Sequence, residues 1–208
     1  AVHFPVTATA RQIATRSLCV NLSDMAAMGA EPRWFTLALT LPKEKANSAW
    51  LTEFSAGIAE IAGQFDIALV GGDTTSGPLT ISLTLLGEAP SGESLRRSGA
   101  VVGDSIFVTG TLADGVAGLK TASSINSNHS NSDRLLQRFY APQPQISTGL
   151  QLRGIATACI DISDGLVADL GHLCQSSAVA ATIYTEQLPI AADVREMAPQ
   201  NCINWALF

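Results

Sequence analysis

Two carboxylates stand three residues apart in the segment 160–166 (IDISDGL), between an apolar run and a pattern typical of a helix. A strand-to-helix turn needs one capping residue, so capping alone explains either Ser163 or Asp164. The hydroxyl of Ser163 and the amides at a helix start are also suited to an anion such as phosphate. The positions of other acids in the chain indicate whether Asp161 and Asp164 bind a ligand that requires negative charge.

Two further acids stand where packing alone does not require them. Asp24 falls near the C-terminal end of a predicted helix, where the helix dipole disfavours an anion by up to about 1 kcal/mol. Asp73 follows two glycines and a short apolar strand, a position at which α/β proteins commonly bind ligands. The ordinary alternatives are a solvated helix residue for Asp24 and an Asx turn for Asp73.

If these acids converge, they favour the binding of a metal ion. Two carboxylates about 5 Å apart repel by roughly 3 kcal/mol at an effective dielectric of about 20. No Lys or Arg lies within these motifs, and the His and Cys residues show no transition-metal spacing. We therefore expect Mg²⁺, which combines a few carboxylates with waters and substrate phosphates.

Phosphate-binding groups lie close to these acids in the sequence. Arg97 offers a bidentate charge to phosphate, although an arginine in a linker is usually just solvated. The Walker pattern and the dinucleotide-binding glycine pattern are both absent, so a nucleotide site has to be of another type.

The composition predicts a globular chain. With 208 residues, 47% of them hydrophobic, it can bury the core of one large domain or two small ones. No apolar run approaches the roughly 20 residues of a membrane helix, so we expect no membrane partner. A net charge of −6 with no basic cluster beyond Arg96 and Arg97 argues against nucleic-acid binding. The four scattered cysteines are predicted to be free thiols of a reducing, cytoplasmic compartment.

The first half of the chain predicts helices and strands that position Asp24 and Asp73. Apolar residues at helical spacing predict two helices, over 8–29 and 50–61. Alternating and apolar runs predict three strands, over 33–41, 67–70 and 79–85, with a turn over 71–78. This order of elements is typical of an α/β or α+β fold.

A loss of periodicity over 89–104 predicts a boundary, with a second α/β domain after it. Strands are expected over 105–110, 155–160 and 181–185. Helices are expected over 114–120, 135–139, 146–154 and 165–174. The Ser/Asn-rich tract 121–133 cannot bury a core and is expected to form a loop.

Taken together, the motifs resemble the thiamine-monophosphate kinase family, which shares a superfamily with aminoimidazole ribonucleotide synthetase and selenophosphate synthetase. The resemblance covers nearly the whole chain, and the combination is more specific than any single motif. It rests on the segments VNLSDMAAMGAEP (20–32), LALTLP (37–42), VGGDTTSGP (70–78), RRSGAVVGDSIFVTG (96–110) and DISDGLVADLGHL (161–173).

The resemblance implies a two-domain, synthetase-like α/β fold. Residues 1–95 would form the ATP- and Mg-binding domain, which also pairs in a homodimer, and residues 96–208 the C-terminal α/β domain. It implies Mg²⁺-dependent transfer of the γ-phosphoryl group of ATP to thiamine monophosphate, giving thiamine diphosphate and ADP. Charge neutralisation by carboxylate-held Mg²⁺ suits this reaction, which requires no side-chain nucleophile.

The resemblance also implies roles for individual residues. By motif position, the implied metal ligands are Asp24, Asp73, Asp161 and Asp164. The residues implied to contact ATP are Gly72, Asp73, Arg97 and Ser163. His3 is implied to contact the thiamine substrate.

The family pattern includes motifs that these 208 residues do not contain. A Gly-Asp-Asp stretch and a Ser/Thr-Asp segment precede the matching region in the family, and a Gly-Gly-Glu-Asp-Tyr motif follows it. We therefore expect an internal fragment with both domains incomplete and with little activity by itself. The alternatives are another ATP-dependent synthetase of the same superfamily and a non-catalytic nucleotide-binding remnant.

Overall fold

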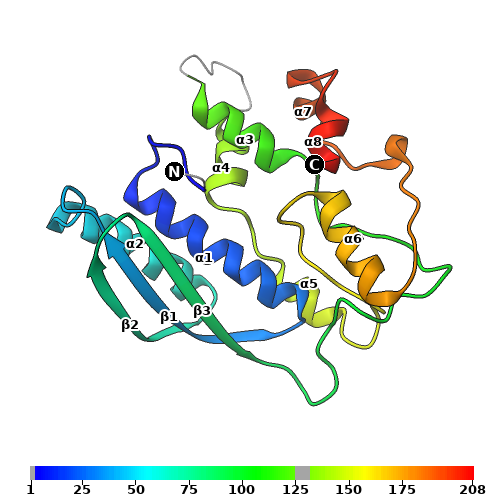
Figure 1. The fold of residues 1–208 in the computed structure, drawn as a ribbon, viewed down its shortest axis with the longest axis horizontal. Coiled ribbons are helices and arrows are strands. Elements are labelled where there is room, and N and C mark those ends of the chain that lie inside the picture. Colours follow the sequence, from blue (N-terminus) through cyan, green and yellow to red (C-terminus); the bar gives the residue numbers. More distant parts are fainter. Residues whose placement is uncertain (1–2, 125–131) are drawn as a thin grey trace.

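The computed structural model describes residues 3–124 and 132–208, which form a mixed α/β fold with one sheet (Figure 1). This architecture confirms the predicted fold class. The strands are β1 (Glu31–Leu41), β2 (Ala68–Ser76) and β3 (Thr80–Glu88). The helices are α1 (Ala10–Ala27), α2 (Ser48–Gln64), α3 (Asp114–Ser123), α4 (Ser132–Tyr140), α5 (Ile146–Gln151), α6 (Leu166–Ser177), the 3₁₀ helix η1 (Thr185–Gln187), α7 (Ala192–Met197) and α8 (Cys202–Leu207).

Helix α1 begins and ends at residues whose side-chain chemistry favours those positions. The Thr9 hydroxyl accepts a hydrogen bond from the Gln12 amide, and the Gln12 side chain accepts one from the Thr9 amide. At the other end, Gly29 takes a φ of +58° and donates its N–H to the Ala26 carbonyl. The predicted helix with its glycine end is confirmed, and Asp24 lies in its last turn.

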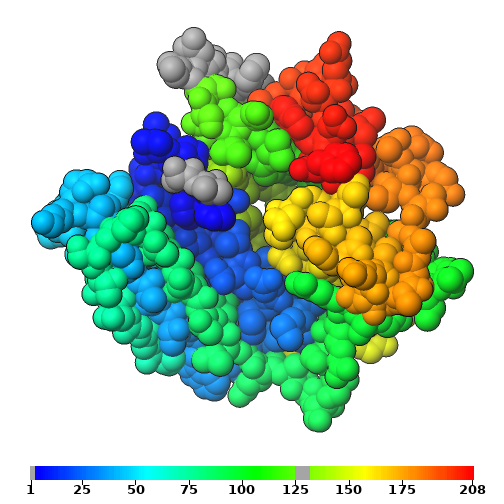
Figure 2. Space-filling model, viewed as in Figure 1, coloured from blue at the N-terminus to red at the C-terminus, as the bar shows by residue number. Residues whose placement is uncertain are grey.

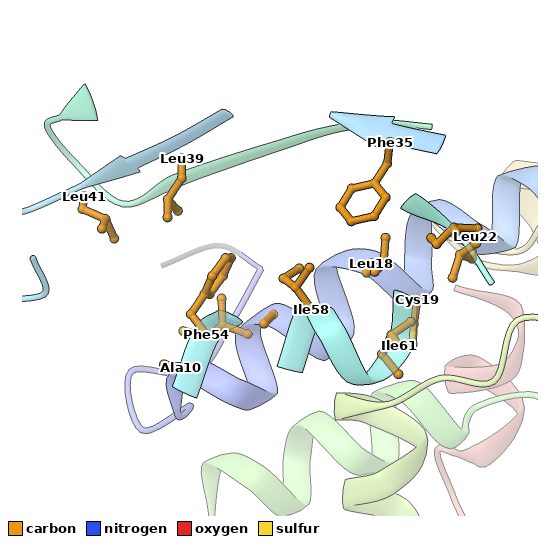
Figure 3. Close-up of a cluster of buried hydrophobic side chains, with 13 residues drawn as sticks. Ala10, Leu18, Cys19, Leu22, Phe35, Leu39, Leu41, Phe54, Ile58 and Ile61 are labelled. Atoms are coloured by element: carbon orange, nitrogen blue, oxygen red, sulfur yellow. The ribbon is translucent and has the colours of Figure 1, made fainter. Parts of the chain in front are cut away.

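The sheet has the strand order β2-β1-β3, with β1 parallel to β2 and antiparallel to β3. One face packs on α1 and α2, and Figure 3 shows Phe35, Leu39 and Leu41 of β1 directed toward these helices. Phe54 of α2 and Leu18 of α1 complete this first core and are almost fully buried. Within the described residues, no helix covers the opposite face of the sheet.

Strand β2 is longer than the sequence predicted. The expected strand ended at Val70 and was followed by a turn, but β2 continues through both glycines to Ser76. Pairing with β1 supplies the backbone hydrogen bonds that a turn would otherwise have to provide, so tertiary pairing overrides the local turn preference. Asp73 therefore lies inside the strand, opposite Ala38, and not after its end.

The strands predicted for the second half of the chain are wrong. Residues 105–110, 155–160 and 181–185 are all described, and none of them belongs to a β ladder. Alternating apolar residues favour a strand only where a second backbone lies alongside to pair with it. In the described part of this half, β pairing is limited to an isolated bridge between Leu112 and Ile190.

The predicted helices of the second half are confirmed as α3, α4, α5 and α6, with shifted ends. The loop predicted over 121–133 is wrong at both of its ends, because α3 continues to Ser123 and α4 begins at Ser132; its central residues, 125–131, lie outside the described residues. Helices α7 and α8 were missed, since six residues are too few to show helical periodicity. None of the described helices has the length and apolarity needed to cross a bilayer.

Helix α1 also packs against α4 and α5 of the second half. The Arg16 guanidinium lies 4.2 Å from the centroid of the Phe139 ring and donates to the Phe139 carbonyl. At the α5 crossing the helices approach so closely that a Cβ on Gly149 would lie 2.1 Å from the Ala26 carbonyl oxygen. This packing places the C-terminal end of α1, and with it Asp24, beside the second half of the chain.

A second core lies among α3, α4, α6, α7 and α8, and a partly buried cluster of ion pairs links α3, α4 and α7. Asp114, at the start of α3, has a side chain only 6% exposed and accepts hydrogen bonds from Arg134, Arg138 and Thr111. Arg134 also bonds both carboxylate oxygens of Asp193 on α7. Burial by itself would raise the pKa of Asp114, but the hydrogen bonds from these donors outweigh it and hold the pKa below its usual value.

Asp114→Asn is expected to lower the free energy of unfolding at pH 7 by about 1–3 kcal/mol, because two arginines lose their shared carboxylate. Since the folded-state pKa is depressed, the stabilisation is present above the unfolded pKa of about 3.9 and is lost as the pH falls through the folded pKa. Urea unfolding at pH 7 and near pH 2 tests this. Equal losses at both pH values would contradict it.

Burial in the first core raises the pKa of the Cys19 thiol to about 12, although nearby Arg16 opposes the shift. Because the thiolate is the reactive form, Cys19 is expected to resist alkylation in the folded chain and to react fully in urea. Half-buried Cys174 serves as the internal control and should react without denaturant. Mass spectrometry of the alkylated peptides measures both. Labelling of Cys19 in the folded chain as fast as of Cys174 would contradict the prediction.

Candidate functional site

A pocket of about 260 Å³ lies at the C-terminal end of α1. Its lining comes from three segments that are far apart in sequence, namely the last turn of α1, the arginine-containing loop at 95–97, and the segment 159–161 that precedes α6. The yellow surface leading into α6 lies beside the blue surface of α1 in Figure 2, on the face drawn there. The lining residues are Asp24, Ala27, Met28, Leu95, Arg96, Arg97, Cys159, Ile160 and Asp161.

Backbone hydrogen bonds hold the three segments together. The Leu95 amide donates to the Met28 carbonyl at 2.9 Å, and the Cys159 amide donates to the Arg96 carbonyl at 2.8 Å. The loop that carries Arg97 is thus fixed between α1 and the segment before α6. The Ser177 hydroxyl, at the far end of α6, donates to the Arg97 carbonyl at 3.2 Å and tightens the same loop.

The pocket brings two of the predicted carboxylates together with the predicted arginine. Burial raises the pKa of Asp161, the negative charges of Asp24 and Asp169 raise it further, and Arg97 opposes the shift. The carboxylates of Asp24 and Asp161 provide hard oxygen donors for a cation. Arg97 places a guanidinium beside them, where a phosphate group can pair with it.

The loop between Asp161 and α6 is held by an acid that the sequence reading missed. The buried carboxylate of Asp169 accepts hydrogen bonds from the amides of Ser163 and Asp164, at 2.8 and 3.0 Å. Gly165 occupies the N-cap position of α6, so the interpretation that Ser163 or Asp164 caps this helix is wrong. The sequence did contain a signal for a buried acid here, because Asp169 falls between the apolar positions 166 and 170 on the buried side of a predicted helix.

Asp73 does not join this pocket. It pairs with Ala38, on the same side of the sheet as Thr40 and Thr75, whose hydroxyls lie 2.8 Å apart. That side is opposite to the face that Phe35 presents to the first core. The Asp73 carboxylate is exposed and accepts a hydrogen bond from the adjacent Thr74 amide within β2, so the Asx turn that the sequence offered as an alternative is not formed.

The remaining predicted residues lie outside the pocket lining. Ser163 and Asp164 have exposed side chains in the loop after Asp161, and His3 is exposed in the segment before α1. Gly72 lies against the backbone of Leu37. Within 3–124 and 132–208, no three His, Cys, Asp or Glu side chains are grouped closely enough to hold one metal ion. The convergence of Asp73, Asp161 and Asp164 that the sequence suggested is therefore absent from this part of the chain.

Comparison with known proteins relates this arrangement to one family. Residues 1–89 match the family described as AIR synthase related protein, N-terminal domain. The thiamine-monophosphate kinase of Escherichia coli (strain K12) is 43% identical over 208 residues, which cover 99% of this chain and 63% of the relative. The chain thus spans slightly less than two thirds of that relative's length.

Two solved structures match over the entire chain. The crystal structure of thiamine-monophosphate kinase from Stenotrophomonas maltophilia K279a has a TM-score of 0.93 at 43% identity and is covered to 67% of its length. The structure of AaThiL complexed with AMPPCP and TMP also has a TM-score of 0.93, at 32% identity, and is covered to 68% of its length.

Proposed function

Because this chain belongs to the thiamine-monophosphate kinase family, we propose that the protein carrying it transfers the γ-phosphoryl group of ATP to thiamine monophosphate, giving thiamine diphosphate and ADP. The observation that carries this proposal is the pocket in which Asp24, Asp161 and Arg97 meet. It offers carboxylates for a metal ion next to a guanidinium for a phosphate. The AaThiL relative, which matches the whole chain, was solved with the ATP analogue AMPPCP and with TMP.

We propose Mg²⁺ as the metal, held first by Asp24 and Asp161. Their oxygens fit this ion, which typically uses one or two carboxylates together with substrate phosphates and waters. When bound, Mg²⁺ would neutralise the phosphate charges that otherwise repel each other as the two anions react. Asp164 is a further proposed metal ligand. Asp73 is also a proposed metal ligand, but it can bind only if the metal-nucleotide complex extends to the uncovered face of the sheet.

We propose that Arg97 pairs with a phosphate of ATP and that Ser163 donates its hydroxyl to another. Arg97 is supported by its place in the pocket and by the Ser177 bond to its backbone. Gly72 and Asp73 would contact ATP from the sheet, and His3 would contact thiamine monophosphate. These three assignments rest on motif position alone.

We propose that residues 1–95 and 96–208 are two domains and that the first pairs two copies of the protein in the cytoplasm. The two separate buried clusters support the division, since one lies within residues 10–67 and the other within 112–206. The uncovered sheet face supports the pairing, because Trp34 and Leu86 stand opposite each other on it and are both more than 40% exposed. The four free thiols are in keeping with a reducing compartment.

The test is to incubate the protein expressed from the complete gene, and separately the 208-residue chain, with ATP, Mg²⁺ and thiamine monophosphate. Formation of thiamine diphosphate and ADP in equal amounts, abolished by EDTA, is the expected result for the complete gene product. ADP and free phosphate without thiamine diphosphate would indicate another synthetase of the superfamily. Binding of ATP with no turnover of either substrate would indicate a non-catalytic remnant, and both outcomes would overturn the proposal.

A further inference from the structure

We infer that Asp169 is a positioning residue that fixes the loop 161–165 in the shape required by the metal-nucleotide site. The role in the metal-nucleotide site rests on the proposed function, whereas the restraint of the loop by Asp169 can be measured independently of that function. Asp169 is 4% exposed and lies in the first turn of α6, with its carboxylate directed back at the loop. One oxygen, Oδ2, accepts both consecutive amides, those of Ser163 and Asp164.

The two hydrogen bonds determine which way the loop faces. Because the amides of Ser163 and Asp164 are drawn inward to Asp169, the side chains of both residues remain exposed on the outer side. Bonds from amides to an ionised carboxylate are stronger than bonds between neutral groups, and the helix start further favours the negative charge. The carboxylate thus ties the preceding loop to the first turn of α6, whereas a capping side chain would accept from amides of the helix itself.

The following glycine strengthens this constraint. Gly165 has a φ of +107°, and a Cβ there would lie 2.9 Å from the Cα of Phe208, next to the end of α8. The loop is therefore held on one side by Asp169 and on the other by a close backbone contact. Asp169 and this contact thus restrain the turn between Asp161 and α6 at two points.

A second, largely buried acid provides a matched control. Asp193 also lies in the first turn of its helix, has a side chain 11% exposed, and accepts a hydrogen bond from the adjacent Val194 amide at 2.9 Å. It additionally bonds Arg134. Asp193 thus shares the structural role of an acid at a helix start, but its hydrogen bonds go to Arg134 and Val194 and not to the loop 161–165.

The experiment compares Asp169→Leu, Asp169→Asn and Asp193→Asn in the gene product. Leucine keeps the shape of aspartate and lacks an acceptor, whereas asparagine keeps one oxygen at the same position. Hydrogen exchange of the Ser163 and Asp164 amides is measured without metal or nucleotide, and ATP affinity is measured with and without Mg²⁺. Asp169→Leu should speed exchange of these amides at least tenfold and weaken Mg²⁺-dependent ATP binding about 10–100-fold.

Asp169→Asn should recover most of the protection, and Asp193→Asn should change the stability of the fold while leaving the loop amides and ATP affinity within about twofold. If Asp169→Leu does not fold, Asp169→Ala carries the same test. The inference is overturned if loss of the acceptor leaves exchange and affinity unchanged, or if Asp193→Asn changes them equally. Absence of thiamine diphosphate formation by the unsubstituted protein would instead refute the proposed function, because the exchange measurement uses neither substrate.

Discussion

Asp161→Asn is expected to lower kcat/KM for thiamine diphosphate formation by on the order of 10²–10³-fold with little loss of stability. The substitution keeps the shape of the side chain and removes its charge. Asp161 shares its pocket with Asp24, so the pair would lose half of the negative charge proposed to hold Mg²⁺. Relief of the repulsion between them should also leave the folded chain at least as stable as before, because burial and the Asp24 charge already disfavour ionised Asp161.

Steady-state kinetics at several Mg²⁺ concentrations measure the loss of kcat/KM, and urea unfolding measures the change in stability. Part of the lost activity should return at high Mg²⁺, since the remaining carboxylate still provides a ligand. Asp66→Asn is the matched control, because Asp66 is exposed and has a φ of +52°, a conformation that asparagine tolerates well. Activity of Asp161→Asn close to that of the control would remove Asp161 from the site.

Gly72→Ala is expected to destabilise the fold by at least about 3 kcal/mol by breaking the β1–β2 pairing. A Cβ at this position would lie 2.0 Å from the Leu37 carbonyl oxygen, and the φ of +154° is one that side chains rarely adopt. The obstacle is backbone, so no rotamer change can relieve it. This backbone contact requires glycine at position 72 whether or not ATP also reaches it, whereas the sequence had suggested only that the glycine lets a ligand approach.

Thermal and urea unfolding of the unliganded protein measure this effect. Gly63→Ala is the control with the opposite expected sign, because a methyl group added to Gly63 in α2 would meet no other atom within 4 Å. Alanine also favours a helix over glycine by about 0.5–1 kcal/mol. Unchanged stability of Gly72→Ala with a loss of ATP affinity alone would contradict this packing requirement and leave contact with ATP as the reason for the glycine.

Local chemistry in the sequence was sufficient for the elements whose signals lie within a few residues. The Thr9 capping box and the Gly29 end of α1 each involve partners no more than four positions apart. The same is true of the apolar periodicity that predicted α1, α2 and α6. Such features depend on the nearest turn of the backbone, so the rest of the fold changes them little.

Pairing between distant segments had to be decided by the tertiary structure. The turn residues after Val70 became part of β2 because β1 lies beside them, while equally apolar strand candidates such as 155–160 found no partner. The order of motifs identified which acids belong to the family pattern, but it could not show that Asp24 and Asp161 meet in one pocket while Asp73 faces away from the core. The order of motifs also could not show that Asp169 holds the loop, because this depends on the direction in which the buried Asp169 carboxylate points from α6. Residue types and their spacing determined the chemistry available to this protein, and the packing of α1 against the second half of the chain decided which of those groups stand together.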